Sequence, residues 1–366
     1  MKTNPRTSFP RRRALPFTVS ILATLLGCAP QADLQDPATL RMNDIQVVGS
    51  HNSYKKAMLP EVMQQLRAVN PEVADSLDYE HDPLEEQLDR GLRNLELDVF
   101  WDPDGTRYSW PEGHDPTSAL RVLHVQNLDD QSHCATLTSC LGQLRNWSLA
   151  NPGHLPIAVT MNAKDQVIEQ EGFVQPLPFD EAAWQFVDST LRSGLGSQLI
   201  EPREVFPQEA SEERNGALPT WPLLDDARGR FLFVLDEQGP KRASYAARWH
   251  ERAMFTNTSP GEPGAAVLIL NDPIARGPFI QQSVRDGYLV RTRADADTVE
   301  ARLGTTERRD AAFASGAHWV TTDYDVPAKF GTGYAVELPG GGVARCNPAL
   351  ELNESACDAL RGRTDN

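Results

Sequence analysis

Residues 92–99 read Leu-Arg-Asn-Leu-Glu-Leu-Asp-Val, so apolar and polar side chains alternate along the stretch. Successive side chains of a β-strand point to opposite faces, and the alternation predicts a strand with Glu96 and Asp98 side by side on one face. If the leucines pack against helices, the carboxylates face a confined interior, where they repel each other unless they share a proton or a cation. Oxygen ligands favour Ca²⁺, with Mg²⁺ the weaker candidate, over zinc. A Glu-x-Asp pair taken alone more often lies on an edge strand with both acids in solvent. The residues of the neighbouring strands must therefore decide between the two interpretations.

Short apolar or alternating runs recur along the chain and predict seven further strands. With the first, the predicted strands are residues 45–49, 92–99, 121–125, 156–162, 231–236, 266–271, 288–292 and 319–323. Helical signals lie between most of them. The predicted helices are one opened by Asp82-Pro83 and closed by Gly91, one with the stripe Leu137, Leu141, Leu144 and Trp147, and those at 180–195 and 297–316.

Eight alternations of strand and helix predict an α/β fold, a single (β/α)8 TIM-type barrel over residues 43–330. A doubly wound open sheet is the main alternative. The stretch 201–230, rich in proline and charge, is predicted to be a long loop over the barrel rather than a domain boundary.

Polar residues recur at the C-terminal ends of the predicted strands, which is where barrels of this type carry their reactive groups. They are His51, Asn52, Glu96, Asp98, His124, Asn162, Asp236, Asn271, Asp272 and Asp323. A single histidine among them would more often be structural than catalytic. Two histidines beside two acids predict a centre for acid/base and metal chemistry.

The N-terminus has the pattern of a sorting segment. Three arginines, residues 11–13, precede an apolar run at 15–26 that is too short to span a bilayer. The run ends in Leu-Leu-Gly-Cys28, which resembles a bacterial lipobox. We therefore expect a signal peptide at 1–27, an acylated Cys28 and a tether at 28–42, with a plain signal peptide as the alternative. The expected location is the bacterial cell envelope, as an outer-membrane or surface lipoprotein, or the exterior.

The charge of the chain excludes some partners. Its net charge is −16, and removal of the signal peptide takes away five basic residues and no acid, leaving about −21. Nucleic acid is therefore excluded as a partner, as is a membrane contact through a basic patch. Contact with a membrane is expected through the lipid anchor instead.

The four remaining cysteines form two local pairs in the sequence, Cys134 with Cys140 and Cys346 with Cys357. An even number in an exported chain predicts two disulfides, and short loop closure favours the local pairing among three possible connectivities. A zinc site is disfavoured, because the spacings are not C-x-x-C. The second pair lies in a predicted C-terminal extension, residues 331–366.

Three motifs resemble the calcium-dependent phosphatidylinositol-specific phospholipases C, especially their secreted bacterial branch. They are Gly-Ser-His-Asn-Ser-Tyr at 49–54, Leu-Arg-Asn-Leu-Glu-Leu-Asp at 92–98 and Val-Leu-His at 122–124. Weaker similarities occur at Cys134, Cys140, Trp147, 151–154, 164–165, 221–222, 228–229, 231–236, 315–317 and 322–324. The resemblance covers most of residues 43–330.

The resemblance implies roles for the polar residues at the strand ends. His51 would stabilise the phosphate or act as base, and His124 would protonate the leaving glycerol oxygen. Asn52, Glu96 and Asp98 would hold Ca²⁺, which would lower the pKa of the attacking inositol hydroxyl. The substrate would then be phosphatidylinositol or a related phosphodiester lipid, and the base could also be Glu96 or Asp98.

One position departs from the pattern. Where this family usually has an acidic fourth ligand, the chain has Asn162, which offers an oxygen but no charge. Because ligand charge tunes calcium affinity, we expect weaker binding unless Asp165 or another acid compensates. Lys164 is expected to contact the substrate phosphate rather than a metal.

Two other functions remain open from the sequence. A glycerophosphodiester phosphodiesterase shares the barrel, two histidines and an acid pair, but typically has His-Arg-Gly where this chain has His51-Asn52-Ser53. A non-catalytic lipoprotein that binds a ligand in a degenerate barrel site is favoured by Asn162. Against it, both histidines and all three expected metal ligands are retained.

Overall fold

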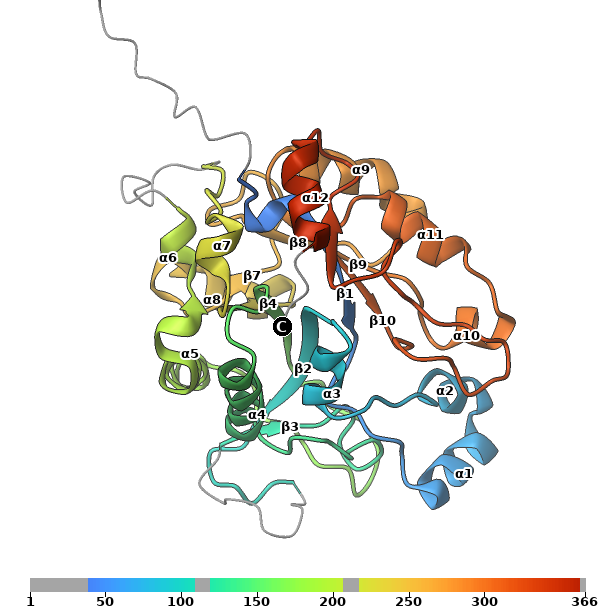
Figure 1. The fold of residues 1–366 in the computed structure, drawn as a ribbon. Helices are drawn as coiled ribbons and strands as arrows, with labels where there is room; N and C mark the ends of the chain where they lie inside the picture. The colour runs from blue at the N-terminus through green and yellow to red at the C-terminus, as the bar shows by residue number, and fades with distance from the viewer. Residues whose placement is uncertain (1–38, 109–118, 207–216, 363–366) are drawn as a thin grey trace, which may run out of the picture. The chain divides into compact units, whose positions relative to one another are not determined.

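A ring of parallel strands surrounded by helices forms the body of the molecule (Figure 1). The structure is a computed structural model that describes residues 39–108, 119–206 and 217–362. The ring strands are β1 (Ile45–Ser50), β2 (Asn94–Trp101), β4 (Ile157–Ala163), β6 (Phe231–Leu235), β7 (Phe255–Thr256), β8 (Val267–Ile269), β9 (Leu289–Arg293) and β10 (Trp319–Thr322). They pair in the order β7-β6-β4-β2-β1-β10-β9-β8. A parallel bridge between Asn257 and Val267 joins β7 to β8, which confirms the predicted barrel.

Helices cover the outside of this ring. They are α1 (Pro60–Val69), α2 (Pro71–Ser76), α3 (Leu84–Asp89), α4 (Leu137–Ala150), α5 (Glu181–Leu195), α6 (Pro202–Val205), α7 (Leu224–Ala227), α8 (Gly239–Ala246), α9 (Pro273–Arg285), α10 (Val299–Leu303), α11 (Glu307–Ala314) and α12 (Glu354–Gly362). Shorter elements are η1 (Met42–Asp44), β3 (Leu120–Val122), η2 (Gly196–Gln198), β5 (Leu199–Ile200), η3 (Trp249–Glu251) and β11 (Ala344–Cys346). No helix within these described ranges is long and apolar enough to cross a bilayer.

The two faces of β2 have the environments that its alternation predicts. Leu95, Leu97 and Val99 are fully buried in a cluster with the apolar stripe of α4, including Leu141 and Leu144. Side chains at alternate positions of a strand point the opposite way, so Glu96 and Asp98 face the barrel interior. Burial of the leucine face thus fixes the direction of the acids.

The strand predicted at 121–125 is wrong as a barrel strand. The apolar run there forms β3, which pairs antiparallel with the far end of β2, Val122 opposite Val99. Its place in the ring is taken by β7, a strand of two residues that pairs with β6. Two residues are too few to show any alternation, and an apolar run does not reveal its partner or its direction.

Two helical predictions also need correction. The helix predicted at 297–316 is two helices, α10 and α11, because Gly304 takes a left-handed conformation with φ of 68° between them. The helix predicted to open at Asp82-Pro83 is α3, whose capping residue is Pro83, while Asp82 instead pairs with Arg90. The expected helices α4 and α5 begin at Leu137 and Glu181.

The structure covers the predicted loop at 201–230 in part and both predicted disulfides, but not the predicted signal peptide. Within 201–230, the described residues include α6 and α7, and this stretch meets the start of the chain where Met42 N donates to Pro222 O. Both expected disulfides, Cys134–Cys140 and Cys346–Cys357, are present. Cys28, the signal peptide and most of the tether lie outside the described residues, so they stay predictions.

The C-terminal segment adds a strand to the barrel wall. β11 pairs antiparallel with the first three residues of β1, Ile45 to Val47, whereas β2 meets β1 only further along, where Gly49 lies opposite Asn94. A Cβ at Gly49 would lie 2.4 Å from Asn94 O, so this close approach requires glycine. β11 therefore fills the part of the ladder that β2 leaves open.

Candidate active site

The turn that follows β1 fixes the first two residues of the candidate site. His51 N donates to Thr322 O at 2.9 Å, and Ser53 N donates to Glu96 O at 3.0 Å, so the turn is tied to both neighbouring strands. Asn52 between them has a φ of 50°, a left-handed conformation that asparagine tolerates better than most residues. His51 and Asn52 are thereby held at the C-terminal end of the barrel beside Glu96.

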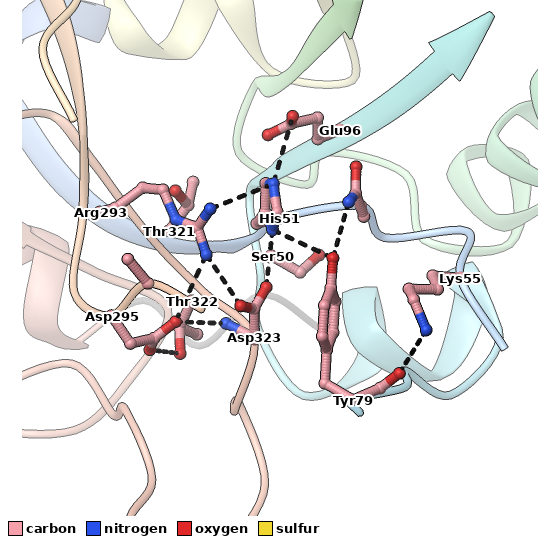
Figure 2. Close-up of polar contacts among 12 residues, drawn as sticks. Ser50, His51, Lys55, Tyr79, Glu96, Arg293, Asp295, Thr321, Thr322 and Asp323 are labelled. Atoms are coloured by element: carbon pink, nitrogen blue, oxygen red, sulfur yellow. Dashed lines mark hydrogen bonds and ion pairs between the residues drawn. The ribbon is translucent and has the colours of Figure 1, made fainter. Parts of the chain in front are cut away.

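Both ring nitrogens of His51 contact charged side chains (Figure 2). Its Nδ1 lies 2.7 Å from Oδ1 of Asp323, and its Nε2 lies 3.2 Å from Nη1 of Arg293. A guanidinium can only donate, so Nε2 accepts, and the remaining ring proton lies on Nδ1 and is donated to Asp323. His51 is therefore a neutral imidazole whose lone pair on Nε2 is its basic atom.

Electrostatics supports the neutral form of His51. Burial lowers its pKa and Arg293 lowers it further, while Asp323 and Glu96 act in the opposite direction. Burial alone would raise the pKa of Asp323, but Arg293, with Nη2 at 2.8 Å, and His51 hold it below its usual range. Asp323 therefore stays ionised and orients the ring. The buried Asp295 behind it accepts a hydrogen bond from Asp323 N at 2.9 Å.

The acid pair on β2 is held by nitrogen donors. Asn162 Nδ2 donates to Glu96 Oε1 at 2.8 Å and to Asp98 Oδ1 at 3.0 Å. Lys164 Nζ lies 3.0 Å from Asp98 Oδ2, and Arg291 pairs with Glu96 Oε2. Two carboxylates are thus matched by two side-chain cations within the barrel mouth.

The ion pair between Asp98 and Lys164 shifts both groups. Burial acts to raise the pKa of Asp98, but Lys164, His124 and His51 outweigh it and lower that pKa. Asp98 in turn raises the pKa of Lys164. The opposite charges of this buried ion pair thus stabilise each other's ionised form.

The predicted calcium ligands fit the ion by the type of donor. Carboxylate and amide oxygens of Asn52, Glu96, Asp98 and Asn162 are the hard ligands that Ca²⁺ prefers. Asn52 uses its nitrogen on Tyr79 Oη at 2.7 Å and so has its oxygen available. Rotation of the Asn162 amide by half a turn would point its oxygen at the space between the carboxylates.

The negative charge that this ligand set can offer a cation is small. Asn162 supplies no charge, and Lys164 and Arg291 already pair with the two acids. Within the described part of the chain, no three His, Cys, Asp or Glu residues gather in a group that could hold a metal. The chemistry of the donors therefore suits calcium, and the set carries less negative charge than one with three acids.

His124 lies in the loop that follows β3. Its Nδ1 is 2.8 Å from Oδ2 of Asp129, and its side chain is 15% exposed. Nε2 has no hydrogen-bond partner in the described part of the chain. A histidine bound to a carboxylate through Nδ1 presents Nε2 as its working atom.

The sequence predictions missed several residues around the two histidines. They are Lys55, Tyr79, Asp129, Arg291 and Arg293; Asp323 had been placed at a strand end without a role. A signal for the arginines exists, since Arg291 and Arg293 lie two apart in one strand and so share one face. Lys55 and Asp129 lie in loops and have no such pattern. Of the other residues predicted at strand ends, Asp272 caps α9 and Asp236 pairs with Asn257.

Comparison with known proteins agrees with the fold. A sequence model of the family described as "Phosphoinositide phospholipase C, Ca2+-dependent" matches residues 40–348. Among solved structures, a calcium-dependent phosphoinositol-specific phospholipase C from a Gram-negative Pseudomonas species, with myoinositol bound, is similar with a TM-score of 0.53 and 18% identity. The match covers 85% of this chain and 97% of that chain.

A second solved structure is similar to the same degree. It is a Ca²⁺-dependent phosphatidylinositol-specific phospholipase C from Streptomyces antibioticus, with a TM-score of 0.50 and 20% identity, over 78% of this chain and 95% of that chain. Comparison with curated protein sequences finds no match.

Proposed function

Because the chain belongs to the calcium-dependent phosphoinositide phospholipase C family, we propose that it cleaves phosphatidylinositol or a closely related phosphodiester lipid as an exported enzyme. Membership of this family identifies it as a phosphodiesterase of phospholipase C type. The observation that carries the finer proposal is the pair of histidines, each bound through Nδ1 to a buried aspartate. One is a neutral proton acceptor and the other is bound to a carboxylate through Nδ1.

The reaction follows from the division of labour between the histidines. His51 Nε2 takes the proton of the substrate hydroxyl next to the phosphate, once Arg293 gives up its hydrogen bond to that atom. The hydroxyl oxygen attacks phosphorus, and the bond to the glycerol oxygen breaks. His124 Nε2 gives a proton to that oxygen, so the products are a cyclic phosphodiester and diacylglycerol. Glu96 is less available as a base because Arg291 and Asn162 occupy its oxygens.

Calcium is proposed at the oxygen atoms of Asn52, Glu96, Asp98 and Asn162. When bound, the ion would neutralise charge on a phosphate oxygen and acidify the attacking hydroxyl. Lys164 is proposed to bind the substrate phosphate; its ammonium already lies at the mouth, 30% exposed and 3.0 Å from Asp98. It is thus the side-chain cation of the acid pair that is open to a substrate.

The test is an assay of the purified protein on phosphatidylinositol vesicles, with and without a calcium chelator. We expect release of inositol phosphate that the chelator reduces, and loss of it in His124→Ala with unchanged folding. A parallel assay on glycerophosphoinositol separates the phosphodiesterase that uses water as nucleophile. No release from either substrate would refute the enzymatic proposal and leave a ligand-binding lipoprotein.

Export and lipidation are proposed from the N-terminal sequence, Leu-Leu-Gly-Cys28. Mass spectrometry of the protein from a bacterial envelope should find a lipid-modified N-terminal Cys28. The variant Cys28→Ser should accumulate as an unprocessed or unlipidated form. An unmodified mature N-terminus elsewhere in the chain would indicate a plain signal peptide instead.

A further inference from the structure

A single residue, Asp129, holds both the backbone and the ring of His124. Asp129 O accepts from His124 N at 3.2 Å, and the backbones of Val125 and Asp129 exchange two hydrogen bonds of 2.9 Å. Asn127 between them has a φ of 62°, which allows the chain to reverse so tightly. The side chain of Asp129 then returns to His124 Nδ1.

The carboxylate of Asp129 makes its contacts through one oxygen only. Oδ2 takes both His124 Nδ1 at 2.8 Å and Lys55 Nζ at 3.3 Å, and both Lys55 and Asp129 have fully buried side chains. Oδ1 is buried and has no hydrogen-bond partner in the described part of the chain. Water does not screen this charge, so it acts on the imidazole and on the ammonium.

Lys55 is a buried cation whose ammonium group is surrounded by oxygen acceptors. Its Nζ donates to the carbonyl oxygens of Tyr79 at 2.6 Å, Leu77 at 3.1 Å and Lys56 at 3.4 Å. Figure 2 shows Lys55 beside Tyr79, whose hydroxyl accepts from Asn52. Burial lowers the pKa of Lys55, and Asp129 partly offsets this. The ammonium thus fixes Asp129 relative to the turn that carries His51 and Asn52.

From this geometry we infer that Asp129, itself anchored by Lys55, is the positioning residue that makes His124 the proton donor to the leaving group. The inference rests on the proposed function and adds to it a residue in a loop outside the barrel ring. Asp129 keeps a proton on Nδ1, turns Nε2 toward the mouth and stabilises the positive ring that is about to donate. Lys55 prevents the carboxylate from rotating away without touching the ring itself.

The test compares two substrates of the same head group. One is phosphatidylinositol, whose alkoxide leaving group needs a proton; the other is an aryl inositol phosphodiester, whose phenolate departs without one. Asp129→Asn keeps the shape and an accepting oxygen but leaves the Lys55 ammonium without its counter-ion. Circular dichroism and thermal unfolding therefore establish the temperature range in which the variant is folded, and both substrates are assayed within that range. Asp130→Asn, on the next residue of the same loop, is the matched control.

General acid catalysis contributes about 10²- to 10⁴-fold, so we expect Asp129→Asn to lower kcat on the lipid by about 10- to 100-fold with little change in KM. On the aryl substrate, we expect a loss under about threefold. Equal losses on both substrates would overturn the inference and leave the proposed function intact. Wild-type protein that cleaves neither substrate would overturn the proposed function, and the inference with it.

Discussion

The two sides of the site use the same three kinds of residue. Each histidine is bound through Nδ1 to a buried aspartate that also contacts a cation: His51 with Asp323 and Arg293, and His124 with Asp129 and Lys55. The two sides differ in which group the cation contacts. Arg293 contacts Nε2 of its histidine at 3.2 Å, whereas Lys55 contacts only the far partner, Asp129.

The opposite proton roles proposed for the two similar triplets rest on this difference. A guanidinium against Nε2 disfavours a positive ring, so the His51 triplet (His51, Asp323, Arg293) keeps a neutral base. In the His124 triplet (His124, Asp129, Lys55) the ring contacts a carboxylate and, among residues 39–108, 119–206 and 217–362, no cation, which suits a proton donor. The location of one cation is therefore the feature that distinguishes the proposed base from the proposed acid.

The largest expected effect comes from removing either histidine and varying the leaving group. His51→Ala should lower kcat by about 10³-fold on both phosphatidylinositol and the aryl diester, because both need deprotonation of the attacking hydroxyl. His124→Ala should cost about as much on the lipid and far less on the aryl diester. Steady-state assays of the four combinations check this. The reverse pattern would exchange the two roles.

The next effect concerns stability, because each of the two cations pairs with a buried carboxylate. Lys55→Met leaves Asp129 as an unpaired buried charge and should lower the free energy of unfolding by about 3 kcal/mol. Urea denaturation measures this, with Lys56→Met, an exposed neighbour, as the control. Arg293→Gln should also lower the free energy of unfolding, because it leaves the buried Asp323 and Asp295 without their cation. Equal behaviour of the two lysine variants would show that the ammonium does not anchor Asp129.

A smaller effect is expected at the acid pair that lies between the triplets. Asn162→Asp adds a charge beside Glu96 and Asp98, and should tighten calcium binding by about tenfold. Isothermal titration with Ca²⁺ measures this, and Asn151→Asp at the end of α4 is the control for added charge. Unchanged affinity in Asn162→Asp would remove residue 162 from the ligand set.

The smallest effect is a displacement of the pH profile. Arg293 lowers the pKa of His51, so Arg293→Gln raises that pKa, and the base is protonated at higher pH than in the wild type. The acid limb of kcat/KM should therefore move to higher pH, and activity should fall most under acidic conditions. Arg302→Gln, which removes an arginine that pairs with Asp78, is the control. An unmoved acid limb would argue against His51 as the base.

The barrel and the faces of β2 could be predicted because burial leaves a periodic pattern. Glu96 and Asp98 alternate with leucines that pack on α4, and that alternation fixes the face of each acid. The same rule does not extend to β7, whose two residues carry no period. Nor does an apolar run such as that of β3 reveal whether it joins a ring or folds back on a neighbour.

The site could be predicted only where it follows strands. His51, Asn52 and Asn162 lie at or next to strand ends, and the structure brings them together with Glu96 and Asp98. The residues that set the proton positions come from contacts far apart in the sequence, such as Lys55 with Asp129. Their pairing depends on how two loops fold, and no local pattern records it.

The pairing of β11 with β1 also affects what the folded chain can do to its neighbours. Ile45, Gln46 and Val47 would offer free N–H and C=O groups on one side if the C-terminal segment were cut or displaced. Such an open ladder is a template onto which another molecule can add a strand. The disulfide Cys346–Cys357 joins β11 to α12, so the strand that covers this edge of β1 is covalently linked to the helix that follows it.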